Sequence, residues 1–220
     1  MPPFASQYTE IFDRFGYPLS AAHGICDSVL DRTAERLGCS IPEALRSYYE
    51  VAGKEKRFNL AFQQILPPAR WSLAGGHLVF IEESQGVCNW GVSVKSKGAR
   101  DPGISQGFEE ETDEGESTVS WHPENARCST FIKVLLHYQA VSGGYRFCGG
   151  GTAPEDVQKR LKRGWTFVGE VSELWAYSRP NQVVCIMSGA GLIDDLMIMA
   201  GGKTAKDLAA IGESLGITFA

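Results

Sequence analysis

The segment from His77 to Val92 constrains the fold of this chain most, because it has the pattern of a β-hairpin. Its first half, residues 78–81, is an apolar and partly β-branched run of strand length. Its second half alternates Trp90 and Val92 with small or polar residues. The polar link contains Gly86, which can take the positive φ that a tight connection often needs. The segment therefore predicts two antiparallel strands joined by a short turn.

Helical and strand patterns surround this hairpin. The third helix has the clearest start, since Ser40 and Glu43 have capping-box spacing with Pro42 in the first turn. The predicted helices span residues 6–15, 21–37, 41–52 and 129–138, a segment capped at Thr152 and running to about Arg163, and 204–215. Further strands are predicted at 119–121, 174–178, 182–188 and 192–199. These elements predict a single α+β domain over residues 1–220, with a mainly antiparallel or mixed sheet packed by N-terminal, central and C-terminal helices.

Composition places the chain among ordinary globular proteins. It has 220 residues, of which 43% are hydrophobic and 21% charged. No apolar run approaches the roughly 20 residues that cross a bilayer, and the first ten residues lack the pattern of a signal peptide. We therefore expect a cytoplasmic protein without membrane association.

Negative charge is concentrated between residues 101 and 126, which contain eight acidic residues and no Lys or Arg. Without them, 18 of the 26 acidic residues face 21 basic ones, so the net charge of −5 has a local origin. One interpretation is a mobile, solvated loop. The other is a surface that presents negative charge to a basic partner. The candidate partner-binding residues are Glu109, Glu110, Glu111, Asp113, Glu114 and Glu116.

No motif predicts a catalytic or metal site. The six cysteines, at 26, 39, 88, 128, 148 and 185, include no C-x-x-C pair and are interpreted as reduced and mostly buried. The histidines at 23, 77, 122 and 137 stand apart, and no serine lies in a G-x-S-x-G elbow. Glu82 and Glu83 are neighbours at a strand end, which favours a polar terminus with one glutamate bonded to turn amides.

Four glycine-rich or basic segments imitate phosphate-binding sites. Residues 201–204 (GGKT) lack the first glycine of a phosphate-binding loop, so a helix start is favoured. Residues 189–191 (GAG) favour a turn between strands, since the rest of the dinucleotide fingerprint is missing. Residues 148–152 favour a flexible loop over an anion site, and the basic residues Lys159, Arg160, Lys162 and Arg163 favour a solvated helix face. We therefore predict no cofactor and no direct nucleic-acid binding.

The hairpin sequence L-V-F-I-E-E-S-Q-G-V-C-N-W-G-V resembles the signature of the SUKH (Smi/Knr-type) superfamily. Ser84 stands where that signature has Asn. The matching residues of the turn are Glu82, Glu83, Gln85, Gly86 and Trp90. Upstream, residues 37–45 together with Tyr48, Tyr49 and Gly53 look like the helix that the family places before the hairpin, so the strongest support lies in residues 37–92.

The resemblance implies a non-enzymatic protein-binding domain. Bacterial members look like immunity proteins that neutralise polymorphic toxins, many of them nucleases, by direct binding. A nuclease attracts phosphate with a basic cleft, so an acidic segment suits such a partner. Fungal members act in cell-wall and signalling control, which leaves a regulatory scaffold as the alternative, followed by an enzyme with an unrecognised site. The identity of the partner and the oligomeric state are left open.

Overall fold

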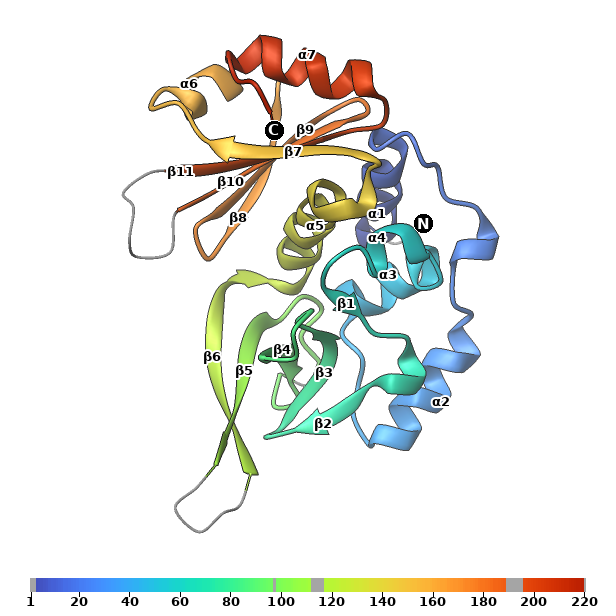
Figure 1. The fold of residues 1–220 in the computed structure, drawn as a ribbon. Coiled ribbons are helices and arrows are strands. Elements are labelled where there is room, and N and C mark those ends of the chain that lie inside the picture. Colours follow the sequence, from blue (N-terminus) through green and yellow to red (C-terminus); the bar gives the residue numbers. More distant parts are fainter. Residues whose placement is uncertain (1–2, 97, 112–116, 189–195, 220) are drawn as a thin grey trace. The chain divides into compact units, whose positions relative to one another are not determined.

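The computed structural model describes residues 3–96, 98–111, 117–188 and 196–219, and its contacts divide the chain into two compact units. Unit 1 comprises Met1–Thr9 and Leu19–Phe131, and unit 2 comprises Glu10–Pro18 and Ile132–Ala220. Helices α1 (Pro3–Arg14) and α5 (Cys128–Gln139) contribute residues to both units. Each unit has its own antiparallel sheet, which confirms the α+β class (Figure 1). The single domain over residues 1–220 stays a prediction.

Unit 1 contains a six-stranded antiparallel sheet with the order β1-β3-β4-β5-β6, in which β2 also pairs with β3. Its helical elements are η1 (Ala21–His23), α2 (Asp27–Leu37), α3 (Glu43–Ala52), α4 (Lys56–Asn59) and η2 (Pro68–Arg70). Its strands are β1 (Gln64–Ile65), β2 (Ser72–Ala74), β3 (His77–Glu82), β4 (Cys88–Ser93), β5 (Gly103–Glu111) and β6 (Ser117–Arg127).

The hairpin predicted from residues 77–92 is confirmed as β3 and β4. Their antiparallel register runs from His77 opposite Ser93 to Glu82 opposite Asn89. Gly86 has a φ of +74°, so the turn uses the conformation that glycine adopts without strain. The local pattern therefore predicted both the strands and the residue that lets them connect.

Much of the core of unit 1 consists of aromatic side chains whose polar groups form hydrogen bonds. Tyr8, Tyr48, Tyr49 and Trp71 are buried, and the rings of Tyr49 and Trp71 meet edge to face at 4.8 Å. Because a buried hydroxyl or indole N–H must find a partner, the Tyr49 hydroxyl and the Trp71 Nε1 both donate to the Leu66 carbonyl, at 2.6 and 3.0 Å.

The predicted helix over residues 21–37 is interrupted, and this prediction was wrong in its first third. Gly24 is extended, and a Cβ there would lie 2.0 Å from the Glu50 carbonyl oxygen. The next amide, of Ile25, donates to Tyr49 at 2.9 Å, so packing against α3 overrides helix propensity. The α-helix begins only at Asp27.

The helix predicted at 41–52 is confirmed as α3, but its predicted capping box is not formed. The helix begins at Glu43 with Pro42 at the N-cap and no side-chain cap. The amide of Ala44 donates instead to the Arg100 carbonyl at 2.9 Å. Glu43 pairs with the Arg100 guanidinium at 2.7 Å. A segment far along the chain thus supplies what a local cap would supply.

The acidic segment at 101–126 is not a loop in its described parts, so this prediction was wrong. Residues 103–111 form β5 and residues 117–127 form β6, which pair from Gly103 opposite Arg127 to Glu111 opposite Ser117. The strand predicted at 119–121 is the middle of β6. The composition suggested a solvated loop, but β5 pairs with β4 on one side and β6 on the other, and Ile104 and Gly107 are buried.

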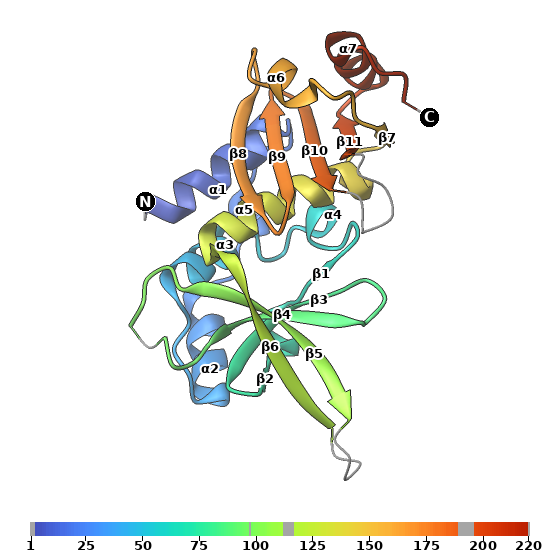
Figure 2. The same ribbon diagram turned by 90° about the vertical axis from the view of Figure 1, so that its left-hand side faces the viewer.

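Unit 2 contains a five-stranded antiparallel sheet with the order β7-β11-β10-β9-β8 (Figure 2). Its strands are β7 (Phe147–Thr152), β8 (Thr166–Val171), β9 (Leu174–Arg179), β10 (Gln182–Ser188) and β11 (Leu196–Gly202). Its remaining helical elements are η3 (Ala140–Gly144), α6 (Val157–Leu161) and α7 (Ala205–Leu215). A buried cluster between α6, α7 and one face of the sheet includes Leu161, Val184, Ile186, Ile198 and Ile211.

The predicted elements of unit 2 are confirmed where the sequence signal is periodic. Strands β9 and β10 and helices α5 and α7 occur where predicted, and the Thr204 hydroxyl accepts the Asp207 amide at 3.1 Å as an N-cap. The strand predicted at 192–199 is found as β11, and its first residues, 192–195, lie outside the described residues.

The flexible loop predicted at residues 148–152 was wrong, as was the cap at Thr152. These residues form β7, paired with β11 from Phe147 opposite Gly202 to Thr152 opposite Met197. The backbone bonds of a long-range pairing outweigh the low strand propensity of three glycines. The helix that follows begins at Val157, with Asp156 at its N-cap.

None of the helices within the described residues is long and apolar enough to span a bilayer.

Candidate functional site

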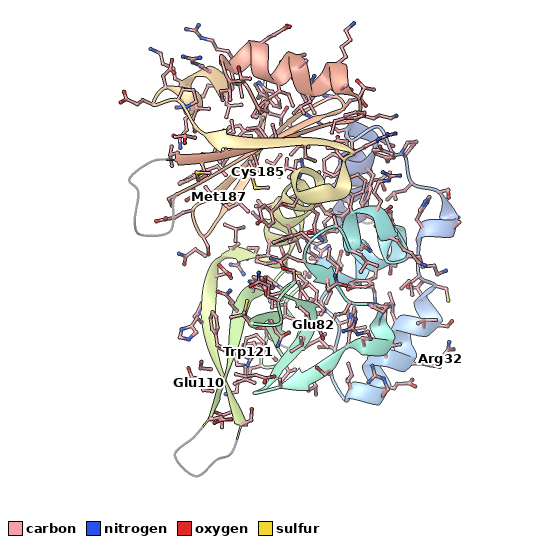
Figure 3. All side chains as sticks on the ribbon, viewed as in Figure 1. Arg32, Glu82, Glu110, Trp121, Cys185 and Met187 are labelled. Carbon is pink, nitrogen blue, oxygen red and sulfur yellow. The ribbon has the colours of Figure 1, made fainter. Side chains whose placement is uncertain are left out.

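The strands β5 and β6 form a two-stranded ribbon, and the last three residues of β5 are consecutive glutamates. Glu109, Glu110 and Glu111 are exposed and lie opposite Val119, Thr118 and Ser117 of β6. Because neighbours along a strand alternate, Glu110 lies on one face of the ribbon and the other two on the opposite face. Figure 3 labels Glu110 on this ribbon, and its carboxylate accepts the Ser120 hydroxyl at 2.6 Å. Asp113, Glu114 and Glu116 lie outside the described residues.

Two other acids of the 101–126 segment hold the ribbon in place. The Asp101 carboxylate accepts the Ser129 amide at 2.8 Å and its hydroxyl at 2.6 Å, and so caps the start of α5. The Glu124 carboxylate accepts the Trp90 Nε1 at 2.9 Å. The structure thus separates Asp101 and Glu124, which bond to other elements, from the exposed Glu109, Glu110 and Glu111, of which Glu110 bonds to Ser120 within the ribbon.

Trp121 of β6 fixes the ribbon to the rest of unit 1. Its ring stacks on His77 with centroids 4.1 Å apart and lies over backbone at three glycines. A Cβ at Gly107 would lie 2.9 Å from three ring atoms, one at Gly91 would lie 3.1 Å from the ring, and one at Gly75 would lie 2.7 Å from Nε1. Side chains at these positions would therefore displace the indole.

The turn between β3 and β4 is held by its own residues. The Glu83 carboxylate accepts the Gln85 amide at 2.6 Å and the Ser84 hydroxyl at 2.9 Å. Although burial raises the pKa of Glu83, these bonds lower it below its usual value. Glu82 pairs with Arg70 at 2.6 Å. The prediction of a polar terminus with one glutamate bonded to turn amides is confirmed.

Trp90 and Gly91 contact the ribbon from both faces of β4. The Trp90 indole donates to Glu124, and its ring lies 6.0 Å from that of Phe131. Gly91 faces the opposite way and lies under Trp121, and a Cβ there would also lie 2.8 Å from the Leu78 carbonyl oxygen. Trp90 and Gly91 therefore anchor the β5–β6 ribbon, and this positions its glutamates.

The cysteines are all free, as predicted, and three of them lie in the core. Cys88, Cys128 and Cys185 are buried, and burial raises the pKa of each thiol. Cys88 also accepts the Gln106 side-chain amide at 3.0 Å. Cys26 is exposed, so the prediction of mostly buried thiols does not extend to it.

The four histidines lie on separate elements. His23 lies in η1, where it contacts Ser20, and His122 lies in β6 beside Phe108. His137 in α5 is fully buried against Phe15, at 4.9 Å between ring centroids. Its Nδ1 lies 2.7 Å from the Lys133 carbonyl, while its Nε2 has no hydrogen-bond partner within the described residues.

Acid is expected to destabilise unit 2 through His137. Burial is the main cause that lowers the pKa of His137 to about 4, so the protonated form is favoured in the unfolded chain. The contribution of neutral His137 to the free energy of unfolding is therefore complete above about pH 6.5. It is lost as the pH falls toward 4, and the total loss is about 3 kcal/mol. Urea unfolding of the wild type and His137→Leu across this range measures it. Parallel pH profiles of the two proteins would contradict it.

The GGKT segment and the basic cluster both lie in unit 2, where Lys203 and Arg160 have polar partners. Residues 201 and 202 end β11, and Lys203 donates to the Gly16 carbonyl at 2.6 Å, which confirms the helix-start interpretation. In the basic cluster, Arg160 pairs with Asp156 at 2.7 Å, while Lys159, Lys162 and Arg163 are exposed. The predicted turn at 189–191 lies outside the described residues.

A small hollow of about 160 Å³ lies beside the start of α3. The ionisable side chains among its described lining residues are Glu43 and Arg100, which pair with each other. Elsewhere in the described ranges, no group of three or more His, Cys, Asp or Glu side chains is placed to hold a metal ion. The exposed glutamates of the β5–β6 ribbon are the candidate site to which the charge pattern of the sequence also points.

Sequence reasoning missed Trp121 and the glycines beneath it. The signal was present, because Gly91 and Gly107 both interrupt strands, and glycine in a strand often marks a close approach. Their common partner lies on another strand, however, and the spacing alone did not identify it.

Comparisons with known proteins identify no relative of this chain. No family model matches, and neither the curated proteins nor the solved structures give a significant match.

Proposed function

We propose that this chain is a non-enzymatic, SUKH-like immunity protein that neutralises a cognate toxin by direct binding. The observation that carries the proposal is the row Glu109, Glu110 and Glu111, exposed on a paired strand. Neither residues 103–111 nor residues 117–126 include a Lys or Arg that could neutralise it. Negative charge at this end of the ribbon is therefore available to a partner.

A paired ribbon is a better binding surface than a loop of the same composition. Trp121, Trp90 and Asp101 fix the ribbon through contacts with β3, β4 and α5. Preorganised side chains lose less conformational entropy when a partner binds, so more of the interaction energy appears as affinity. Because the three glutamates occupy both faces of the ribbon, a concave partner could contact them from two sides.

The charge of unit 1 favours a basic partner. Unit 1 contains 16 acidic and 11 basic residues, a formal charge of −5, whereas unit 2 contains 10 of each. A nuclease binds phosphate through a basic cleft, so a toxin of this class offers the complementary charge. Such complementarity speeds association and suppresses the wrong partners.

Co-purification from the native cell tests the proposed function. We expect the tagged chain to retain one basic protein at equal stoichiometry, and mass spectrometry identifies that protein. A matched bait with Glu109, Glu110 and Glu111 changed to Gln should retain much less of it. Recovery of a small molecule without any protein would count against the proposal. Several signalling proteins at low stoichiometry would favour the scaffold instead.

A further inference from the structure

Strand β7 is an edge strand of the sheet in unit 2. Among the described strands it pairs with β11 alone, and Figure 2 shows it at the end of the row β8, β9, β10, β11, β7. An edge strand carries backbone N–H and C=O groups that no neighbour within the sheet uses. Such a row of groups is a template for another strand.

The register identifies the outward groups of β7. The Ala153 amide donates to the Leu196 carbonyl at 2.7 Å, which makes these residues a hydrogen-bonded pair. Bonded and non-bonded pairs alternate in antiparallel strands, so Gly151 and Gly149 also bond to β11. Cys148, Gly150 and Thr152 then direct their N–H and C=O groups away from β11, toward the free side.

The other sheet edges in the described part of the chain are protected. Strand β8 has a register shift between Phe167 and Gly169, and Arg14 donates to Thr166 at its start. Strand β6 contains Pro123, and the β2–β3 turn lies close to its Val119 carbonyl. Strands β1 and β2 are only two and three residues long. A bulge, a proline, a neighbouring segment that covers the edge and a short edge strand each limit pairing between molecules.

Strand β7 lacks a bulge and a proline, and it is six residues long. Its sequence, FCGGGT, contains no charge and no proline, and its pairing with β11 is continuous over six residues. The described part of the molecule does not require glycine at two of these positions. Among the described residues, a Cβ at Gly151 would meet nothing within 4 Å, and one at Gly150 would meet only the Ile198 oxygen at 3.5 Å. The bare strand instead leaves room for a second backbone at close range.

We propose that β7 pairs with β7 of a second copy of this chain, antiparallel and centred on Gly150. A two-fold axis at this residue brings Gly150 opposite itself and Cys148 opposite Thr152, so that all the outward groups of both copies are bonded. The same register brings Arg146, exposed before β7, close to Glu155 of the second copy, which is exposed after it. Because each copy offers one basic and one acidic residue at matching positions, the charges favour a second copy of this chain over a strand from another protein that carries basic residues alone.

Sedimentation equilibrium of the full chain tests the dimer. We expect the apparent mass to rise from 24.0 kDa toward twice that value between micromolar and submillimolar concentration. Gly150→Pro removes an outward N–H that β11 does not use, and should weaken the dimer at least about tenfold. Gly150→Ala keeps the N–H and is the matched control, and circular dichroism checks that both variants are folded.

A charge swap keeps the test decisive if Gly150→Pro disturbs the fold. Arg146→Glu and Glu155→Arg should each weaken the dimer, and the double variant should restore it. A wild type that stays monomeric throughout, or a dimer unaffected by these substitutions, would overturn the inference. The acidic ribbon belongs to unit 1, so failure here leaves the proposed function standing, and loss of toxin binding leaves the dimer standing.

Discussion

Gly107→Ala is expected to lower the free energy of unfolding by about 2 kcal/mol, because the added methyl must displace a rigid indole. A Cβ at this position would lie 2.9 Å from three atoms of the Trp121 ring, which is stacked on His77. The indole therefore cannot yield without giving up its contacts with the sheet. Urea unfolding of wild type and variant at one low protein concentration measures the loss.

A double-mutant cycle separates this mechanism from a general intolerance of Gly107. In a Trp121→Ala background the ring is gone, so Gly107→Ala should change stability by less than about 0.5 kcal/mol. Gly151→Ala is the matched strand control, because a methyl there meets no described residue within 4 Å and should be neutral or slightly stabilising. An equal cost of Gly107→Ala in both backgrounds would show that Trp121 is not the obstacle.

The sequence predicted those parts of the fold whose signals are local. The hairpin at His77–Val92 and the helix capped by Thr204 depend on periodicity and on one or two punctuating residues, and both are present. The acidic segment and the glycines of β7 were assigned to loops because their composition disfavours strands. Pairing with distant strands overrides that preference, and a single sequence does not reveal the pairing.

The candidate site was predicted in its residues but not in its geometry. The exposed positions of Glu109, Glu110 and Glu111 agree with a surface role, although they lie on a strand. The other acids could not be sorted from the sequence, because Asp101 and Glu124 find their partners at Ser129 and Trp90 through the fold. A charge count weighs all acids equally, whereas the hydrogen bonds distinguish them.

Neutralising the six candidate acids should weaken partner binding roughly a hundredfold, since each exposed ion pair contributes about 0.5 kcal/mol. The variant changes Glu109, Glu110, Glu111, Glu114 and Glu116 to Gln and Asp113 to Asn. A matched control removes six exposed acids elsewhere, namely Glu10, Asp13, Glu35, Glu170, Glu173 and Glu213. The control has the same net charge, so it should lose far less affinity if the position of the charge matters. Calorimetry with the co-purified protein measures both.

The salt dependence of that affinity tests the central claim most directly, because exposed charge pairs are screened by ions and apolar contacts are not. The dissociation constant of wild type, six-acid variant and control is measured with the same partner from low to high ionic strength. We predict a steep loss of affinity with salt for wild type and control, and a nearly flat line for the six-acid variant. Equal slopes for all three proteins would contradict a binding site on the acidic ribbon.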